Sequence, residues 1–371
     1  MNICVVGSGG REHALCFALS KSPKCSKLFA VPGNAGMSEL GVCFPTVKAT
    51  DIDAVIAICV ENSVDYCVVA SDDPLAAGLV DALTENGIAA FGPTKAAAYI
   101  EASKAFSKGL MKKYGIPTAR YETFTEGEAA KLYVHTQKLP IVVKADGLAL
   151  GKGVAVAQSY AEAEEFIDEL TSGAKFGSAG ATIVIEEFMS GREATILAFT
   201  DGKTVSLMPA SRDHKRAYDG DKGPNTGGMG AISPVPDVTP ELLSEIERTI
   251  TYPTIDALNK EGRTFKGVIY FELMLTPEGA KVIEYNARFG DPECQTLLPL
   301  LESDLLEVML AVTEERLSEL TIKWKNACSC CVVAASGGYP GDYAKGFAIT
   351  GIADINASNV SVYHAGTALS S

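Results

Sequence analysis

The sequence predicts an α/β protein with a Rossmann-like parallel sheet at its N-terminus, and three observations favour this fold class. The chain of 371 residues is long enough for two or three domains with buried cores. Short apolar runs alternate with helical segments over the first hundred residues, a pattern typical of a parallel sheet. Polar and glycine-rich stretches follow these strands, as expected at the carboxyl edge of such a sheet, where ligands bind.

The overall composition fits a packed globular protein and disfavours several kinds of partner. Hydrophobic residues make up 47% of the chain, and the formal net charge of −14 argues against nonspecific binding to nucleic acid or to an anionic membrane. No apolar run approaches the ~20 residues of a membrane-spanning helix, and the N-terminus leads into a strand without a signal-peptide pattern. We therefore expect a cytoplasmic protein.

The ten cysteines are scattered through apolar segments, apart from the cluster Cys328-Ser329-Cys330-Cys331. The others lack the Cys-x-x-Cys pairs that mark a zinc or redox site. We expect reduced and mostly buried thiols.

The first strand, at residues 2–7, is followed by the loop Ser8-Gly9-Gly10-Arg11 and the start of a helix. A helix that begins after a glycine turn offers free amides and the positive end of its dipole to an anion. As a dinucleotide fingerprint the loop is weak, because its spacing is Gly-x-Gly-Gly and no acidic residue ends a second strand at the expected distance. A packing turn and a ligand cradle are about equally good interpretations. A nicotinamide oxidoreductase is the weakest functional alternative.

Two further strands are expected in this sheet, at residues 27–31 and 66–70, with helices at about 51–63 and 75–86 between them. Because the strands are parallel, the loops that end them gather at one edge of the sheet. The next helix contains Lys104, which by itself would be read as a solvated lysine.

Gly115-Ile116-Pro117-Thr118 breaks the chain and begins a small domain. Lys144 ends an apolar strand, where an unpaired ammonium group would be costly to bury, so we expect a phosphate partner. The loop from Gly147 to Gly153 offers backbone amides and Lys152 to phosphate oxygens, although it is not a P-loop. A plain glycine-rich hairpin is the less favoured alternative, because the strand lysine and the loop occur together.

Charged residues and small-residue loops follow in the second half of the chain. Glu186 and Glu187 end a strand at 183–188, a placement that is common without any function. Five charged or titratable groups then occupy residues 212–216, and the loop 223–231 consists mainly of small residues. Such loops cannot pack a core and are typical of binding segments. His214 can equally be a structural histidine.

The most informative stretch is a β-hairpin at about residues 267–286 that leads into a polar loop. In its second strand Glu284, Asn286 and Arg288 alternate with apolar residues and therefore project on one face. The turn at 276–279 would set Glu272 of the first strand beside Glu284. Carboxylate and amide oxygens bind a hard cation, and a nearby arginine holds the phosphate or carboxylate that the cation bridges. One glutamate would be read as a solvated acid, but these four residues predict magnesium and a phosphate.

The hairpin resembles the metal-binding end of ATP-grasp ligases, and the run Arg288-Phe-Gly-Asp-Pro-Glu293 is similar to the phosphoribosylamine–glycine ligase (glycinamide ribonucleotide synthetase) family. Three further strings match that family: Gly-Ser-Gly-Gly-Arg-Glu-His from residue 7, Pro-Gly-Asn-Ala-Gly from residue 32 and Gly-Pro-Asn-Thr-Gly-Gly-Met-Gly from residue 223. The resemblance therefore spans essentially the whole chain.

The resemblance implies three domains. They are an N-terminal Rossmann-like substrate domain (1–102), an ATP-grasp domain (103–325) and a β-rich C-terminal domain (326–371). Within the ATP-grasp domain it implies a lid subdomain at about 116–190 and a catalytic subdomain at about 191–325. The C-terminal domain looks truncated beside the family pattern, which would leave an exposed sheet edge.

The implied reaction is ATP-dependent ligation of glycine to 5-phosphoribosylamine through glycyl phosphate, the second step of purine synthesis. Its products are 5'-phosphoribosylglycinamide, ADP and phosphate. The chain would act on these small molecules as a monomer or as part of a multifunctional chain, without nucleic acid or membrane.

The resemblance also assigns residues to roles. Lys104, Lys144 and Arg288 would neutralise charge in the transfer, and Glu272, Glu284 and Asn286 would hold Mg²⁺ or Mn²⁺. ATP would be bound by residues in and around the lid: Lys104, Lys144, Gly151, Lys152, Gly153, Glu186, Glu187, Phe188 and Glu193. The substrates would be bound by residues from several loops: Gly9, Gly10, Arg11, Gly33, Asn34, Asp213, Lys215, Asn225, Thr226, Gly227, Arg288, Asp291 and Glu293.

Two positions depart from the family pattern. The loop Ser71-Asp72-Asp73 replaces Gly-Pro-Glu and shortens the acid by one carbon, and Glu272 stands where family members often carry glycine. Two alternatives stay open. One is another ATP-grasp ligase, such as a carboxylase that activates bicarbonate, and the other is an inactive nucleotide-binding relative.

Overall fold

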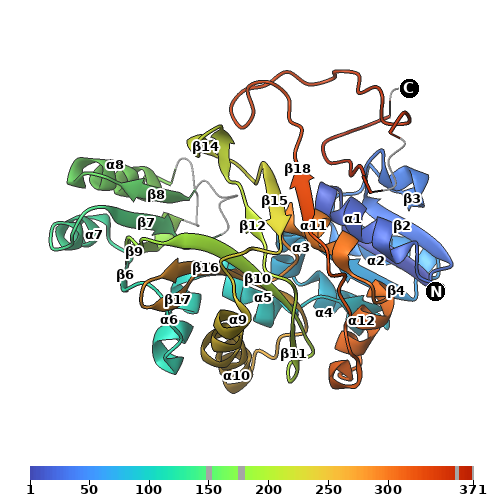
Figure 1. The fold of residues 1–371 in the computed structure, drawn as a ribbon, viewed down its shortest axis with the longest axis horizontal. Helices are drawn as coiled ribbons and strands as arrows, with labels where there is room; N and C mark the ends of the chain where they lie inside the picture. Colours follow the sequence, from blue (N-terminus) through green and yellow to red (C-terminus); the bar gives the residue numbers. More distant parts are fainter. Residues whose placement is uncertain (148–152, 174–179, 356–358, 370–371) are drawn as a thin grey trace.

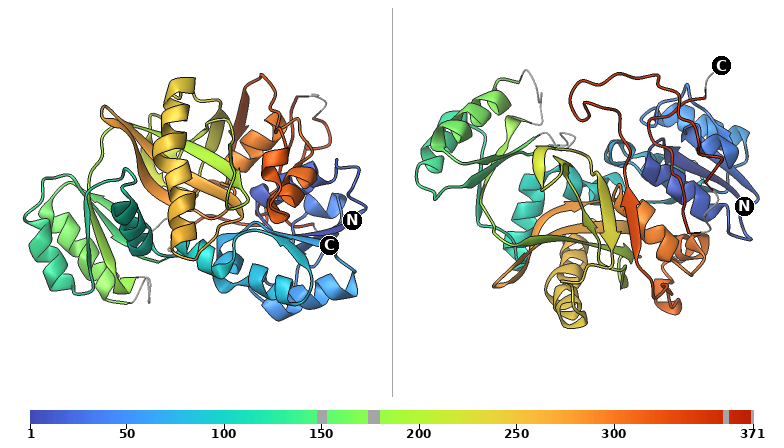
Figure 2. Two further views of the ribbon diagram at one scale, coloured as in Figure 1. Left: turned by 90° about the horizontal axis from the view of Figure 1, so that it is seen from below. Right: turned by 45° about the horizontal axis from the view of Figure 1, so that its top comes forward.

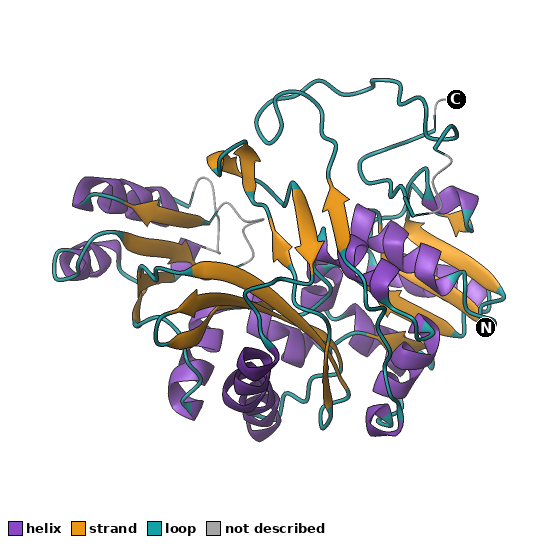
Figure 3. Cartoon of the chain, viewed as in Figure 1, coloured by secondary structure: helices purple, strands orange, loops and turns teal. Residues whose placement is uncertain are grey.

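The computed structural model describes residues 1–147, 153–173, 180–355 and 359–369, and its elements form a row of three parts (Figures 1 and 3). A parallel sheet with its helices lies at one end of the row, and a small antiparallel sheet with two helices lies at the other. A long antiparallel sheet connects them. Ligands that contact all three parts would therefore lie over this central sheet.

The N-terminal part is a parallel sheet in the order β3-β2-β1-β4-β5, which confirms the predicted fold class. Residues of the central strands are buried on both faces, as parallel sheets covered by helices require. The predicted helix at 75–86 is split at Gly78, whose φ of +99° lies in the left-handed region. The elements are β1 (Asn2–Gly7), α1 (Gly10–Leu19), β2 (Lys27–Pro32), η1 (Met37–Glu39), β3 (Val42–Cys43), α2 (Ile52–Glu61), β4 (Tyr66–Val69), α3 (Asp72–Ala77), α4 (Leu79–Glu85), β5 (Ala89–Phe91) and α5 (Lys95–Ala102).

The small part at the opposite end, here called the lid, is an antiparallel sheet in the order β6-β9-β7-β8 with two helices on one face (Figure 2). It has a hydrophobic core of its own, which includes Ala130, Val143, Ile167 and Ile185. Helix α6 (Lys104–Tyr114) precedes it and ends at Gly115, a left-handed cap. The lid elements are β6 (Tyr121–Phe124), α7 (Gly127–Val134), β7 (Ile141–Ala145), β8 (Val154–Ala157), α8 (Tyr160–Thr171) and β9 (Ile183–Glu187).

The central sheet has the order β11-β10-β16-β17, from β10 (Arg192–Thr200), β11 (Val205–Leu207), β16 (Gly267–Thr276) and β17 (Gly279–Asn286). The predicted hairpin is thus confirmed, with Thr276 paired to Gly279 at its turn. Helices α9 (Pro240–Ile246) and α10 (Tyr252–Lys260) lie below the sheet in Figure 1. A π-helical turn, η3 (Glu247–Thr251), joins them just before Pro253, whose missing N–H cannot continue regular helix bonding.

A third sheet, β12-β15-β18, stands between the central sheet and α1, with the short ribbon β13–β14 above it (Figure 1). These strands are β12 (Arg212–Asp213), β13 (Arg216–Tyr218), β14 (Lys222–Asn225), β15 (Gly230–Ser233) and β18 (Ser329–Val332).

The segment after the central hairpin is broken into short helices. Pro299 lies in a 3-10 turn after the first short helix, and Asp304 then caps a new helix through Leu306 N. The segment contains α11 (Glu293–Leu297), η4 (Leu298–Leu300), α12 (Leu305–Thr313) and η5 (Leu317–Glu319). No helix in the described part of the chain is long and apolar enough to cross a membrane.

The C-terminal segment begins with a strand of the third sheet. Its strand β18 pairs with β15, so it completes a sheet with the preceding residues. Residues 360–366 are irregular and run back over the N-terminal part (Figures 1 and 2). There the backbone N–H of His364 donates to His13 Nδ1 over 2.8 Å, and the Asn34 amide donates to the His364 carbonyl over 2.8 Å.

Candidate active site

Two carboxylates face each other across the central hairpin. Glu272 and Glu284 are directly paired residues of β16 and β17, so the two acids lie side by side as predicted. The next pair is Leu273 with Val282, so Ile283 is an extra residue in a β-bulge. Because of this bulge, Val282 takes the buried position predicted for Ile283, while the acids keep the predicted face.

Positive charges surround one of these acids. Burial works to raise the pKa of the Glu284 carboxyl, but the charges of Lys104, Lys144 and Lys215 outweigh burial and lower it. The three lysines come from α6, from the lid strand β7 and from the segment after β12. The fold therefore brings together two lysines predicted for ATP, Lys104 and Lys144, the predicted substrate residue Lys215, and an acid predicted for metal.

Lys215 links the acceptor segment to the hairpin. Its Nζ contacts Glu272 Oε1 and lies 3.3 Å from Glu193 Oε2. Burial lowers the pKa of Lys215, but Asp213 and Glu193 outweigh that effect and raise it. Both the backbone N–H and the hydroxyl of Thr226 donate to the Lys215 carbonyl, over 2.7 and 2.9 Å. Thr226, predicted to bind substrate, thus holds the backbone that carries Lys215.

The donor set of the hairpin fits a divalent cation. Glu272, Glu284 and Asn286 supply carboxylate and amide oxygens, the ligands that Mg²⁺ prefers. Arg288 Nη2 donates to Asn286 Oδ1 over 3.0 Å, and Lys215 contacts Glu272. Asn286 Oδ1 and Glu272 Oε1 thus each face a positively charged side chain. A bound divalent cation would also place positive charge at these two oxygens.

A buried charge cluster sits where the lid meets α6. The Glu186 carboxylate lies 3.0 Å from both Lys108 Nζ and Lys144 Nζ, and all three side chains are almost fully buried. Burial lowers the pKa of Lys108 to about 8, although Glu186 works to raise it. Lys108 also donates to Thr118 Oγ1 over 2.7 Å. Glu186 is thus a partner for Lys144 within the chain, so the burial of Lys144 does not by itself require a phosphate, and its phosphate contact stays a prediction.

The same cluster changes the role available to Glu186. Its carboxylate is enclosed by the two ammonium groups, which leaves only its backbone for the predicted contact with nucleotide. The Glu187 carboxylate pairs with Arg120 at 2.7 Å, whereas Phe188 is exposed. Glu193 is exposed at the start of β10 beside Lys215. Of the predicted acids, Glu193 is therefore the one best placed for ribose hydroxyls.

Hydrogen bonds to α6 hold the residue that precedes the glycine loop of the lid. Asp146, directly after β7, accepts hydrogen bonds from Ser103 Oγ over 3.0 Å and from Ala105 N over 2.6 Å, which ties it to the first turn of α6. Lys104 Nζ donates to the Gly147 carbonyl over 3.4 Å. Gly153 is buried at the other end of the loop, while Gly151 and Lys152 lie outside the described residues.

A second pair of acids lies beside the hairpin. Burial raises the pKa of Glu293 to about 7, and the nearby Asp213 carboxylate adds to the effect. Burial raises the pKa of Asp213 as well. The Tyr270 hydroxyl donates to Glu293 Oε1 over 3.0 Å and fixes that carboxyl group. Two neighbouring carboxyl groups that are largely shielded from water are well suited to bind an ammonium group.

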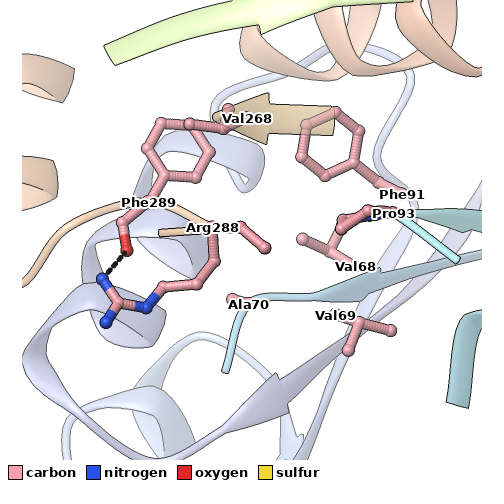
Figure 4. Close-up of a pocket in the computed structure, with 10 residues that line it drawn as sticks. Val68, Val69, Ala70, Phe91, Pro93, Val268, Arg288 and Phe289 are labelled. Atoms are coloured by element: carbon pink, nitrogen blue, oxygen red, sulfur yellow. Dashed lines mark hydrogen bonds between the residues drawn. The ribbon is translucent and has the colours of Figure 1, made fainter. Parts of the chain in front are cut away.

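Arg288 lies between the Asp213–Glu293 pair and the N-terminal sheet. Its Nη2 lies 3.1 Å from Glu101 Oε1, and Glu101 also accepts from Ala287 N over 2.7 Å. Figure 4 shows the guanidinium of Arg288 turned back to the Phe289 carbonyl, at 3.2 Å, beside the strand ends near Ala70. The small cavity there has room for about one water molecule. Arg288 Nε is buried without a partner among the described residues.

The N-terminal loops reach the same region through their backbone. Arg11 is buried, pairs with Glu12 at 2.6 Å and donates to the Phe289 carbonyl over 3.1 Å. Its guanidinium therefore joins two parts of the fold, which conflicts with the predicted substrate contact. Asp291 accepts from Arg11 N over 3.4 Å and from Gln295 Nε2 over 2.6 Å, so it lies directly at the Gly9-Gly10 turn.

The remaining predicted substrate residues have mixed placements. Gly33 has φ +76° in the turn after β2, and the Asn34 amide donates to Ser8 O over 2.8 Å, which holds the two N-terminal loops together. Asn225 is exposed at the end of β14, and Gly227 N donates to the Tyr339 hydroxyl over 3.3 Å. Gly33 and Gly227 thus contribute backbone to these loops. Of the residues in this paragraph that were predicted to bind substrate, Asn225 is the one whose side chain is exposed to solvent.

Sequence reasoning missed three residues that organise the site: Glu101, Lys108 and Asp146. Glu101 and Lys108 are charged groups on otherwise ordinary helices, and their burial depends on neighbours far away in sequence. Asp146 had a visible signal, because it stands between the strand lysine Lys144 and the glycine loop.

Comparisons with known proteins were made on the whole chain. Residues 102–294 match the phosphoribosylglycinamide synthetase ATP-grasp (A) domain, residues 1–101 match the N domain, and residues 329–371 match the C domain of the same name.

Relatives of known name cover nearly all of this chain. It is 48% identical to a phosphoribosylamine–glycine ligase of Nostoc over 100% of its length and 87% of the relative. It is 47% identical to the chicken trifunctional purine biosynthetic protein adenosine-3, covering 99% of this chain but 37% of that longer protein. A crystal structure of phosphoribosylamine–glycine ligase from Thermotoga maritima matches with a TM-score of 0.80 and 32% identity, over 93% of this chain and 83% of that one.

Proposed function

The chain belongs to the phosphoribosylglycinamide synthetase family, and on this premise we propose that it joins glycine to 5-phosphoribosylamine with the hydrolysis of ATP to ADP and phosphate. The glycine carboxylate attacks the γ-phosphorus of ATP, and ADP leaves. The amine of phosphoribosylamine then attacks the acyl carbon of glycyl phosphate, phosphate leaves, and the nitrogen loses one proton.

One observation carries the proposal: the pair Asp213 and Glu293 lies beside Arg288, next to the cation-rich face of the hairpin. Glycine is a zwitterion with an ammonium group and a carboxylate two bonds apart. The two acids suit the ammonium group, and the guanidinium suits the carboxylate. This arrangement directs the glycine carboxylate toward the lysines that would hold the phosphates of ATP.

We assign the nucleotide to the space between the lid and the central sheet. Lys104, Lys144 and Lys215 approach Glu284 from three elements, so their charges would stabilise the phosphoryl group during transfer. The exposed strand end at Phe188 and the acid Glu193 would border the nucleoside. Glu272, Glu284 and Asn286 would hold Mg²⁺ or Mn²⁺, which supplies charge neutralisation at the phosphate oxygens when bound.

We assign phosphoribosylamine to the opening between the N-terminal loops and α11. Asp291 lies at the Gly9-Gly10 turn, where α1 begins, and the N-terminal end of a helix suits a phosphate group. Because Arg11 and Asn34 use their side chains within the fold, backbone amides are the donors we expect there. The altered loop Ser71-Asp72-Asp73 borders this region through Ser71, whose hydroxyl lies 3.5 Å from Glu12 Oε1.

The test is phosphate release from ATP and magnesium, with glycine and freshly generated phosphoribosylamine added together and omitted in turn. We expect release only when both are present. Release that requires bicarbonate and not glycine would indicate a carboxylating ATP-grasp enzyme instead. ATP binding without any substrate-dependent release would indicate the inactive relative, and either result overturns the proposal.

A further inference from the structure

A cluster of three thiols lies inside the N-terminal part, away from the proposed active site. Cys4 in β1 and Cys67 in β4 are paired residues of neighbouring parallel strands. Cys59 reaches the same point from α2, which covers this face of the sheet. The sulfur atoms of the three residues all lie within 4.8 Å of one another, and each residue is fully buried. The chain positions are far apart, so the fold alone creates this group.

The surroundings of the cluster are apolar. Val6, Val55, Val69 and Leu83 belong to the same hydrophobic core as the three cysteines. Among the described residues, this trio is the one group of three or more histidine, cysteine or acidic side chains whose ligand atoms lie close enough together to hold a metal ion. The buried Cys16 belongs to the core on the other side of the sheet, which makes it a matched single thiol for comparison.

We propose that Cys4, Cys59 and Cys67 form a binding site for a soft monovalent metal ion of the Cu(I) class. Three sulfurs placed about 2.3 Å from one ion in a plane lie about 4.0 Å apart, and the observed spacing permits this after small shifts. Structural zinc sites are almost always tetrahedral, and this trio lacks a fourth donor. Soft sulfur ligands favour Cu(I), which does not require four ligands.

The charge balance supports the same class of ion. An apolar core strongly disfavours a net charge, so a neutral complex is preferred. Cu⁺ with one thiolate and two thiol sulfurs is neutral, and its formation releases one proton.

The site would stabilise the N-terminal part. The ion would connect β1, β4 and α2, and binding to the folded state alone raises the free energy of unfolding by mass action. Three thiols can also fill this space simply as small apolar side chains, and that case predicts no specific uptake of metal.

The experiment uses the full chain with its C-terminal cysteine cluster replaced, as Cys328→Ser, Cys330→Ser and Cys331→Ser together. Cu(I) is added without oxygen against a competing chelator, and the stoichiometry is read by native mass spectrometry. We expect one Cu(I) per chain, sulfur-only ligation in X-ray absorption and a higher melting temperature. In this background Cys59→Ala should weaken binding at least 100-fold, whereas Cys16→Ala should not change it.

Several outcomes would overturn the inference. They are no uptake by the background chain, equal uptake after Cys59→Ala, equally tight uptake of Zn(II), or a melting temperature that falls with Cu(I). Circular dichroism checks that each variant is folded. If Cys59→Ala is not folded, Cys67→Ser replaces it, and Cu(I) binding that survives this substitution counts equally against the site.

Discussion

Replacing Glu293 by glutamine should raise the free energy of unfolding of the protein measured without ligands and lower its kcat/KM for glycine. The carboxyl group is buried, and its pKa is raised from 4.5 to about 7 by burial and by Asp213. Glutamine has nearly the same shape and keeps an oxygen that accepts from the Tyr270 hydroxyl. The substitution therefore removes the cost of ionising the group while it preserves the packing.

The size of the effect follows from the pKa values. Because the folded-state pKa lies above the unfolded-state pKa, the folded chain holds an extra proton between the two values, and stability falls as pH rises through that window. The shift corresponds to about 3 kcal/mol at pH 7 and to less than about 1 kcal/mol at pH 5. Glu293→Gln should thus raise the free energy of unfolding by up to about 3 kcal/mol at neutral pH, and by little at pH 5.

The measurement is urea unfolding of the wild type and the variant at several pH values between these limits, with the exposed Glu302→Gln as the matched control. Glycine-dependent phosphate release is measured on the same proteins. Loss of a charged partner for the ammonium group should lower kcat/KM for glycine about 10- to 100-fold. The wild-type profile of kcat/KM should also fall below pH ~7 as Glu293 gains a proton. A variant that is less stable at neutral pH, or whose stability difference does not change with pH, would refute the reasoning.

Three further predictions follow from the other charge clusters. Glu186→Gln leaves two buried ammonium groups without a carboxylate and should lower the free energy of unfolding by about 3 to 5 kcal/mol. Lys108→Met leaves the ion pair of Glu186 with Lys144 and should change the free energy of unfolding little. Comparable losses for the two variants in urea unfolding would contradict this. Glu101→Gln removes the charge opposite Arg288 and should lower kcat/KM for glycine about 10- to 100-fold, with the fold unchanged by circular dichroism; an unchanged value would show that Arg288 needs no such support. Chelation of divalent metal should stop phosphate release, and added Mg²⁺ or Mn²⁺ should restore it; release that persists in the chelator would exclude the metal role.

The parts of the site that the sequence predicts well are those set by local geometry. The hairpin turn brings Glu272 and Glu284 close together, and the bulge at Ile283 then shifts the register by one residue so that the two acids pair directly. The strand lysine and the glycine loop likewise follow each other in the chain, so their proximity was visible. The bulge itself was not predicted, although it is what sets the direct pairing of the two acids.

The parts that the sequence does not reveal depend on long-range charge pairing. Lys144 reads as an unbalanced cation because its partner Glu186 lies on another lid strand. Arg11 reads as a substrate ligand because its glycine-rich neighbours suggest a binding loop, yet its guanidinium connects Glu12 to the Phe289 carbonyl. In both cases the residue type is right for a ligand, and only the burial and the partner show that the side chain is already engaged.

These internal ion pairs bear on how the site keeps its charges in place. A buried ammonium group without a partner would lose its proton or draw the lid out of position, and either change would remove the positive charge that phosphoryl transfer needs. Glu186 opposes this for Lys144 and Glu272 opposes it for Lys215, whereas Glu101 orients the guanidinium of Arg288, which keeps its charge in any case. Each acid also lies on a different element from its cation, so every pair connects two parts of the site. The acids that hold these cations are therefore as important to the proposed chemistry as the cations themselves, although none of the three needs to touch glycine.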